Sequence, residues 1–569
     1  MASSSSSSSP SSPPSAPEIP PPPAYSQAAK LPELTPSFMR AMYPPGLTLI
    51  QAQVFFRHGE RTPVRSRILL DSHTWPFCRR ANFLHAEFMK AVGRFVPRAE
   101  TMPVPDLSRK GDPRYTRATG TQKCGVEYEP AAWSVRLEPS KLDDGMGGGR
   151  ARQGGGGGEG SWDPDVCDMG QLSDVGLDSL RRAGAFLRAL YVDRLGFLPP
   201  TPRQPRDWLY ARTTDYSRVI QSTHALLVGL YPGHPPQPPA SASAPSTLDG
   251  GWPAFNADFL RRFPIHTRMH ADETMHGNFG CYNFIRHFID ATATAARRYK
   301  WIDDVHRQVV GLRSIGEHAR DMLAAPHFGS NYHPIYDELV SLRAHGGALP
   351  ADVGPDMLES LGAAAHYQWT HHVRRLDGQR LGFGRLVDNV VQTMAQAAAL
   401  TPAQAADPAT RPRIGRQAAG DMLLAPGAVR PPQADEAPRV PKLALYGGHD
   451  ITVAPMAIIL GATGREWLPF ASMLTIELFK DAAAHAGLAH DLPRPKTVPA
   501  GLDTRGYFVR VRLNDQVLRL PTCEVPAKHH PQAGSDMCTL AAFFEHLAPV
   551  VASEAEYKAE CGTMPSAEV

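Results

Sequence analysis

The sequence predicts an α/β fold that is interrupted by a helical insertion. Strand-like runs followed by helix-like runs occur near both ends of the chain, and the region between them has mainly helical periodicity. Pro- and Gly-rich stretches separate these parts. With 569 residues, of which 42% are hydrophobic and 20% charged, the chain has the composition of an ordinary globular protein of two or more domains.

The predicted organisation has four parts. Residues 1–46 form a disordered Ser/Pro-rich tail and lead-in, and 47–248 form the first part of an α/β core, with a Gly-rich insertion at 143–160. Residues 249–438 form a helical cap with a Pro/Ala-rich linker, and 439–569 form the second part of the core. The Gly-rich insertion is not a phosphate-binding P-loop, because no Gly-Lys-Ser/Thr closes it.

The first core elements are two strands and two helices. The run "LTLIQAQVFF" at 47–56 is apolar enough to predict a central strand. A helix is predicted at 171–198, with Ser173 as its N-cap. The run "DWLYART" at 207–213 predicts a second strand, and the helix that follows it ends at Pro232.

The later elements begin with the helical middle, from residue 252 to about 400. The run "KLALYGGHD" at 442–450 then predicts a strand, a tight glycine turn and the start of a helix. Two further strands are predicted from "MLTIELFK" at 473–480 and "YFVRVRLN" at 507–514.

Polar residues of the kind used in catalysis follow three of these strands. They are Arg57, His58 and Arg61 after the first, Arg212 and Arg218 at the second, and His449 and Asp450 after the third. In open α/β sheets, ligands bind at the carboxyl ends of the strands. If the three strands are neighbours, their guanidinium groups converge, and these groups match phosphate oxygens in bidentate fashion. The sequence therefore predicts a site for a dianionic phosphoryl group.

Four motifs in order along the chain resemble those of the histidine acid phosphatases, branch 2 of the histidine phosphatase superfamily. They are "RHGERTP" from Arg57, "GQLSDVG" from Gly170, "TDYSRVIQS" from Thr214 and "GGHDITVAP" from Gly447. The resemblance implies a phosphoglycerate-mutase-like three-layer α/β sandwich with an inserted, mainly α-helical cap. Within the family, "REWLPFASMLTIELF" at 465–479 and the cysteines near the end of the chain resemble the lysophosphatidic acid phosphatases of type 6.

The resemblance also implies roles for individual residues. His58 is expected to attack phosphorus and form a phosphohistidine, and Asp450 to protonate the leaving alcohol. The phosphate oxygens are expected to be held by Arg57, Arg61, Arg218 and His449. Motif position selects Arg218 and not Arg212, which either supports the site or lies on a surface strand. No metal or other cofactor is implied, and Glu60 at the variable motif position receives no role.

The predicted function is metal-independent hydrolysis of phosphomonoesters. The alternatives are a non-catalytic phosphate-binding module (a pseudophosphatase), a phytase or inositol-phosphate phosphatase, and a phosphoglycerate mutase. A catalytically inactive relative typically lacks one of the catalytic residues, whereas this chain keeps both His58 and Asp450. The large insertion argues against the mutase.

The predicted cap favours an apolar substrate. Its single lysine between 252 and 400 is Lys300, whereas "NFGCYNFIRHFI" at 278–289 is rich in aromatic residues. These features favour lysophosphatidate or another apolar phosphomonoester over phytate. The open alternative is that this aromatic run forms the cap's own core.

The sequence also indicates which partners and which compartment are expected. A net charge of +3 gives no sign of nucleic-acid binding, and no run of about 18 apolar residues predicts a transmembrane helix. The N-terminus lacks the basic and apolar regions of a secretory signal, and its Ser-rich character is only weakly mitochondrial because arginine is absent before Arg40.

The cysteines indicate the compartment, and the histidine pairs bear on metal binding. The chain has no N-glycosylation acceptor, and its seven cysteines match no zinc spacing, so the sequence favours a reduced, cytoplasmic protein over a secreted one. Whether Cys523 and Cys538 are bonded stays open. The histidine pairs at 371–372 and 529–530 are predicted to be surface residues and not metal ligands.

Overall fold

The computed structural model describes most of the chain in segments. The described residues are 24, 26–64, 75–92, 166–232, 257–277, 281–298, 300–314, 332–414, 420–426, 428–481, 483–484 and 486–562. Residues 1–23 of the predicted tail and lead-in (1–46) and the Gly-rich insertion at 143–160 lie outside them.

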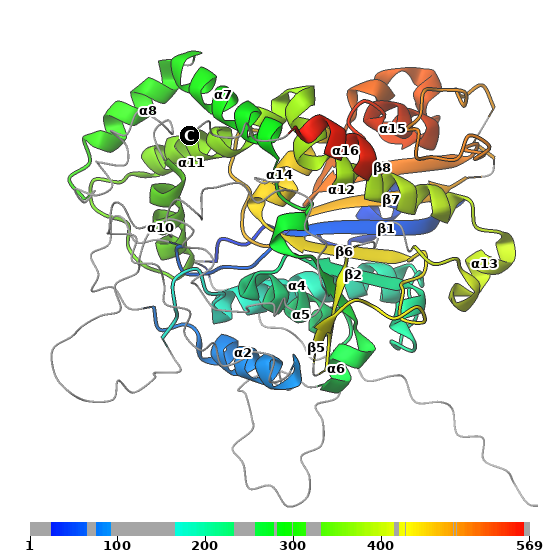
Figure 1. Ribbon diagram of the computed structural model, residues 1–569, viewed down its shortest axis with the longest axis horizontal. Coiled ribbons are helices and arrows are strands. Elements are labelled where there is room, and N and C mark those ends of the chain that lie inside the picture. The colour runs from blue at the N-terminus through cyan, green and yellow to red at the C-terminus, as the bar shows by residue number, and fades with distance from the viewer. Residues whose placement is uncertain are drawn as a thin grey trace, which may run out of the picture.

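A mixed sheet of 11 strands forms the centre of the molecule (Figure 1). Its order is β10-β11-β8-β7-β1-β6-β2-β3-β4-β5, with β9 beside β8. The strands are β1 (Thr48–Arg57), β2 (Leu209–Thr213), β3 (Ile265–Thr267), β4 (Met422–Ala425), β5 (Ala428–Arg430), β6 (Leu443–Gly448), β7 (Met473–Lys480), β8 (Tyr507–Leu513), β9 (Gln516–Leu518), β10 (His529–His530) and β11 (Gly534–Thr539). The neighbours β1, β6, β2 and β3 run parallel, and the other pairs are antiparallel. All five strands expected from the sequence are present.

Helices cover both faces of the sheet (Figure 1). One face carries α2 (Arg79–Val92), α4 (Asp174–Leu187) and α5 (Ser217–Leu230), and the other carries α12 (Leu376–Ala398), α14 (Asp450–Ile459) and α15 (Leu540–Leu547). Successive side chains of a strand point to opposite faces, so Val54 and Phe56 pack in the core under α4 and α5 while Phe55 packs in the core under α12 and α14. The result is the three-layer α/β sandwich that the motifs implied.

A second group of helices lies together at one end of the sheet (Figure 1). It contains α7 (Tyr282–Arg298), α8 (Lys300–Val310), α10 (Tyr332–Ala344) and α11 (Pro355–Thr370). Helices α8, α10 and α11 share a separate apolar core that includes Val309, Leu339 and Leu361. Trp467, from the segment after α14, packs in the same core and joins the helices to the sandwich.

The remaining helices are short. They are α1 (Pro36–Met42), α6 (Ala257–Arg262), α13 (Pro402–Ala406), α16 (Glu554–Cys561), a π-helix at Arg188–Arg194, and 3-10 turns at Pro205–Asp207, His270–Asp272, His371–Arg374, Pro408–Thr410, Pro521–Glu524 and Pro526–Lys528. Within the part of the chain that the structure describes, every helix is too short or too polar to cross a bilayer.

Two sequence-based expectations differ from the structure. The strands β3, β4 and β5 lie within 249–438, where only helices and a linker were expected. Each has three or four residues, too few for a period of two to show in the sequence. Residues 26–29 are also not part of a disordered tail, because Ala29 and Gln27 exchange backbone hydrogen bonds with Phe470 at 2.7 and 3.1 Å.

Six of the seven cysteines form three disulfides. The pairs are Cys78–Cys167, Cys281–Cys561 and Cys523–Cys538, with sequence separations of 89, 280 and 15 residues. These bonds answer the question left open for Cys523 and Cys538, and they do not fit the reduced state that the cysteine pattern favoured. The count failed because pairing depends on which cysteines the fold brings together, and the seventh, Cys124, lies outside the described residues.

Candidate active site

The three predicted strand ends lie side by side. In the sheet, β6 is between β1 and β2, with Arg57 opposite Gly448 and Thr213 opposite Gly447. The strands are parallel, so their carboxyl ends share one edge. His58, His449 and Thr214 each follow one of these ends, and the sheet thereby brings together residues that are up to about 390 positions apart.

The motif loops touch at two glycines. A Cβ atom on Gly59 would lie 2.3 Å from the carbonyl oxygen of Gly176, and one on Gly176 would lie 2.2 Å from that of Glu60. The Gly59 N–H also donates to the Ser222 hydroxyl at 3.2 Å. Because the first two motifs meet here through their backbones, only glycine fits at these two crossing points.

His58 is a neutral imidazole with a defined tautomer. It is 1% exposed, and its Nδ1 lies 2.8 Å from the carbonyl oxygen of Gly59. A carbonyl only accepts hydrogen bonds, so Nδ1 carries the proton and Nε2 keeps its lone pair. Burial holds the pKa of His58 well below its usual range, and the charges of Arg61, Arg218 and Arg57 lower the pKa further.

Arg57 and Asp450 form a buried ion pair. Arg57 Nη2 lies 2.8 Å from Asp450 Oδ2, and Asp450 Oδ1 accepts from the Ile451 N–H at 2.8 Å. Asp450 is the first residue of α14, where the helix dipole stabilises a negative charge. The Arg57 guanidinium also lies 4.2 Å from the Phe470 ring centroid and donates to the Leu468 carbonyl. Asp450 is therefore held at the same strand edge as His58.

His449 lies beside His58, at the end of the neighbouring strand β6. Their ring centroids are 5.6 Å apart, and His449 Nε2 lies 3.0 Å from the Thr214 hydroxyl. The pKa of His449 is well below its usual range, mainly because of burial and then because of the Arg218 charge. Arg218, at the start of α5, places its guanidinium 4.8 Å from the Tyr216 ring centroid. His449 and Arg218 thus lie at the same strand edge as His58 and Asp450.

Arg61 completes the set of predicted anion-binding residues. Its Nη1 and Nη2 donate to the two carboxylate oxygens of Asp337 at 2.9 and 2.8 Å, and Nη1 also donates to the Thr62 carbonyl at 2.9 Å. Asp337 belongs to α10, so a helix of the second group contacts the first motif directly. Arg57 and Arg61 are therefore each paired with a carboxylate of the protein itself.

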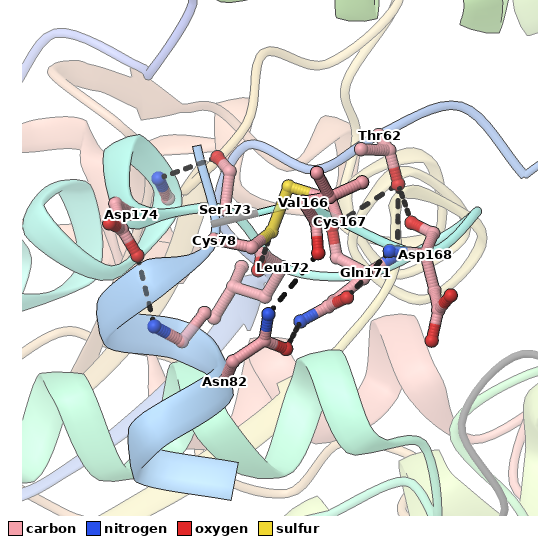
Figure 2. Close-up of a disulfide and its surroundings, with 12 residues drawn as sticks. Thr62, Cys78, Asn82, Val166, Cys167, Asp168, Gln171, Leu172, Ser173 and Asp174 are labelled. Atoms are coloured by element: carbon pink, nitrogen blue, oxygen red, sulfur yellow. Dashed lines mark hydrogen bonds between the residues drawn. A yellow bond between two sulfur atoms is a disulfide. The ribbon is translucent and has the colours of Figure 1, made fainter. Parts of the chain in front are cut away.

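A disulfide supports the loop that carries Thr62 (Figure 2). The Thr62 hydroxyl accepts from the Gln171 N–H at 3.0 Å and donates to the Asp168 carbonyl. Asp168 follows Cys167, which is bonded to Cys78. The covalent link thus ties the segment after the first motif to the loop that opens the second.

The structure corrects three assignments outside the catalytic set. Arg212 is not a surface residue: it is fully buried, ion-paired with Glu273, and donates to the Thr274 hydroxyl at 3.0 Å. His372 and His530 are also buried. Isolated histidine pairs in a sequence carry no signal of which side a helix or strand buries. Within the described segments, no three His, Cys, Asp or Glu side chains come together as a metal-ligand set.

Several residues near the site were missed by the sequence analysis. They include His333, Tyr336 and Asp337 on α10, together with Trp467, Phe470 and Glu60. Glu60 is fully buried, receives a hydrogen bond from Ser26, and has a pKa raised by burial. The spacing i, i+3, i+4 of the three α10 residues is the one signal that the sequence offered, since it places them on one helix face.

Comparison with known proteins gives a consistent family. The histidine phosphatase superfamily (branch 2) matches residues 48–296. A probable acid phosphatase of Schizosaccharomyces pombe is 24% identical over 471 residues, covering 81% of this chain and 78% of that protein. Lysophosphatidic acid phosphatase type 6 of Bos taurus is 23% identical over 324 residues, covering 55% of this chain and 57% of that protein. A Hafnia alvei phytase structure is 12% identical with a TM-score of 0.44, covering 92% of this chain and 100% of that chain.

The relatives are named acid phosphatases, consistent with a phosphoric monoester hydrolase. The match to branch 2 of the histidine phosphatase superfamily spans residues 48–296, a little less than half of the chain. The chain's identity to the type 6 enzyme is no higher than its identity to the yeast protein, so the finer resemblance within the family stays a prediction.

Proposed function

We propose that the protein hydrolyses phosphomonoesters through a phosphohistidine on His58. The observation that carries this proposal is the orientation of the His58 ring. Its Nδ1–H is bonded to the Gly59 carbonyl, which leaves the Nε2 lone pair for attack on phosphorus. The guanidiniums of Arg57, Arg61 and Arg218 lower the pKa of His58 and are the charges that would hold the phosphate oxygens.

The first chemical step forms an N–P bond and breaks the P–O bond to the leaving group. Asp450, in its acid form, gives its proton to the departing alkoxide oxygen. Arg57 is shared between Asp450 and the incoming phosphate, so the same guanidinium positions the acid and contacts the transferred group.

The second step returns the enzyme to its starting state. Water attacks phosphorus while the Asp450 carboxylate takes the water proton, a P–O bond forms, and the N–P bond to His58 breaks. The products are inorganic phosphate, a neutral imidazole and a protonated Asp450. His449, hydrogen-bonded to Thr214, stands opposite His58 and is proposed to contact the transferred phosphoryl oxygens.

The experiment that tests this function is a phosphate-release screen over lipid, inositol and sugar phosphates, with His58→Ala as the blank. We expect release from at least one phosphomonoester by the wild-type protein and none above background by the variant. Release by His58→Ala at the wild-type rate would remove His58 from the mechanism.

For the substrate, we propose a monophosphate with an apolar leaving group, of which lysophosphatidate is one candidate. Within the aromatic run at 278–289, Phe284 is 1% exposed and packs with Leu381 and Tyr557 in a local core, so it does not support this proposal. The support comes from Tyr336, which is partly exposed and whose ring lies 5.7 Å from the Trp467 ring. The Trp467 ring lies 6.0 Å from the Arg57 guanidinium.

Comparing kcat/KM for lysophosphatidate and phytate tests the substrate class. Apolar burial contributes about 25 cal/mol per Å², so kcat/KM should rise with acyl length until the tail leaves the protein surface. A preference for phytate, or no dependence on acyl length, would contradict an apolar leaving-group site and favour the inositol-phosphate alternative.

The disulfides bear on the compartment. Structural disulfides persist in oxidising environments and are rare in the cytosol, so the three pairs favour an oxidising compartment over the cytoplasm expected from the cysteine count. Alkylation of the native protein before and after reduction tests this inference, with six additional reactive thiols expected after reduction.

A further inference from the structure

The contact between Arg61 and Asp337 joins two parts of the chain that are 276 residues apart. Both side chains are 3% exposed, and the two guanidinium–carboxylate hydrogen bonds run in parallel. Asp337 Oδ2 also accepts from the Val64 N–H at 2.9 Å, just beyond the end of the first motif. Burial raises the pKa of Asp337, but the Arg61 charge outweighs burial and lowers the pKa to about 2.

Asp337 is one of three residues that α10 turns towards the active site. His333, Tyr336 and Asp337 share a helix face, and the His333 and Tyr336 rings lie 4.9 and 5.7 Å from the Trp467 ring. One turn further on, Val340 packs against Phe470, whose ring is 6.0 Å from that of His58. This face of α10 therefore forms a wall of the active site.

We propose that Asp337 is a positioning residue of the phosphate site, which fixes the Arg61 guanidinium and limits how tightly the site holds phosphate. This inference rests on the proposed role of Arg61 as a phosphate ligand. It assigns to the second helical group a part in the chemistry and not only in substrate selection.

Asp337 affects phosphate binding in two ways. The bidentate pair removes the rotational freedom of a long side chain, so Arg61 meets the phosphoryl group without an ordering cost. The same carboxylate places a fixed negative charge behind the guanidinium, and this charge repels a bound phosphate dianion. A phosphatase must release inorganic phosphate, so partial neutralisation of one arginine favours turnover over product retention.

Asp337→Asn separates the two effects. The variant keeps one hydrogen bond to Arg61 and loses the charge. We expect the inhibition constant of inorganic phosphate to fall roughly 100-fold, the size of one unit charge about 6 Å away at an effective dielectric constant near 20. We expect kcat to fall by up to about 100-fold, as for a displaced substrate-holding group. KM should fall in parallel with the inhibition constant of inorganic phosphate.

A matched control is Asp178→Asn, which removes the charge from another bidentate pair, Arg80–Asp178 at 3.1 and 2.7 Å between α2 and α4. Its phosphate inhibition constant should equal that of the wild-type protein. If Asp337→Asn does not fold, Asp337→Glu keeps the charge but moves the carboxylate by one methylene, and we expect a lower kcat with an unchanged phosphate constant.

A double variant shows whether Asp337 acts through Arg61. Arg61→Met alone should weaken phosphate binding, measured by calorimetry, and adding Asp337→Asn should then restore far less affinity than it adds to the wild-type protein. Unchanged phosphate binding in Arg61→Met would reject the proposed role of Arg61 itself. Weakened binding in Arg61→Met, but no change of either constant in Asp337→Asn, would reject the inference and leave the proposed function intact.

Discussion

The Nδ1 atom of His58 lies 2.8 Å from the carbonyl oxygen of Gly59, the next residue in the chain. This short local contact settles which ring nitrogen carries the proton, because the carbonyl can only accept. The other nitrogen, Nε2, keeps its lone pair at the edge where three parallel strands end. Gly59 in turn is held by its close approach to Gly176. The chemistry of His58 thus depends on how the first two motifs dock.

We predict that His58→Ala abolishes turnover while the protein stays folded. The side chain contributes a nucleophile and few apolar contacts, so its loss removes the covalent step and little of the core. Rapid quenching of the wild-type protein with a labelled substrate, under conditions that avoid acid, should trap the label on a histidine. Retention of this labelled adduct in His58→Ala would place the nucleophile elsewhere.

For Asp450→Asn, we predict a loss of rate that depends on the leaving group. Alkyl phosphates should slow by roughly 10²- to 10⁴-fold, the usual contribution of a general acid. Aryl phosphates should slow much less, because their phenolate oxygen leaves without full protonation. Steady-state kcat for one substrate of each kind measures the difference. Equal losses for both would assign Asp450 to holding Arg57 and not to proton transfer.

Removing the disulfide between Cys78 and Cys167 should destabilise the protein and lower its activity. A covalent link across 89 residues restricts the unfolded chain, and its loss typically costs about 2–5 kcal/mol. The link also supports the loop that bonds Thr62, next to Arg61. Denaturant unfolding and kcat/KM of the Cys78→Ser/Cys167→Ser variant measure the two effects.

The Cys523→Ser/Cys538→Ser variant is the control for this prediction. Its bond closes a short separation of 15 residues at the far edge of the sheet, beside β10 and β11. It should lower stability and leave kcat/KM of the remaining folded protein unchanged. An equal loss of kcat/KM in both variants would mean that the effect on activity is general.

The buried His372 should make stability fall in acid. Burial lowers its pKa to about 3, whereas an unfolded histidine titrates near 6.5. Above about pH 6.5 both states are neutral and His372 adds no pH dependence; as pH falls towards 3, only the unfolded state gains the proton. The expected loss is about 1.4 kcal/mol per pH unit in that window.

His372→Leu isolates this contribution, because leucine is apolar and suits the contacts that the histidine makes with Phe284 and Phe288. Denaturant unfolding at pH 4, 5, 6 and 7 should give a shallower pH dependence for the variant than for the wild-type protein. Parallel curves would mean that His372 is protonated in the folded state.

We predict that EDTA leaves the activity intact and that vanadate inhibits it. The proposed nucleophile is a side chain and the proposed charges on the phosphate are guanidiniums, so no step requires a metal ion. Vanadate adopts the five-coordinate geometry of phosphoryl transfer and should compete with the substrate. Loss of activity in EDTA that zinc or magnesium restores would contradict the mechanism.

The parts of the site that follow from short motifs were predictable. His58 directly follows β1, which ends in Arg57, and Asp450 is the second residue after β6, which ends in two glycines; such local patterns are visible in the sequence. The strand positions were also predictable, because β1, β6, β7 and β8 are long and apolar. The short strands β3, β4 and β5 were missed because three or four residues show no period.

Long-range partners were decided by the tertiary structure alone. The sequence marks Arg61 as a phosphate ligand, but nothing near it announces that Asp337 will neutralise it. Arg212 and Arg218 look alike in the sequence, and only the sheet and α5 determine that one is buried against Glu273 while the other lies by the strand edge. The pairing of the cysteines and the burial of Phe284 were likewise decided by the tertiary structure. The reason is physical: the chemistry of a motif is encoded within a few bonds, whereas a contact across hundreds of residues forms only when the whole chain has packed.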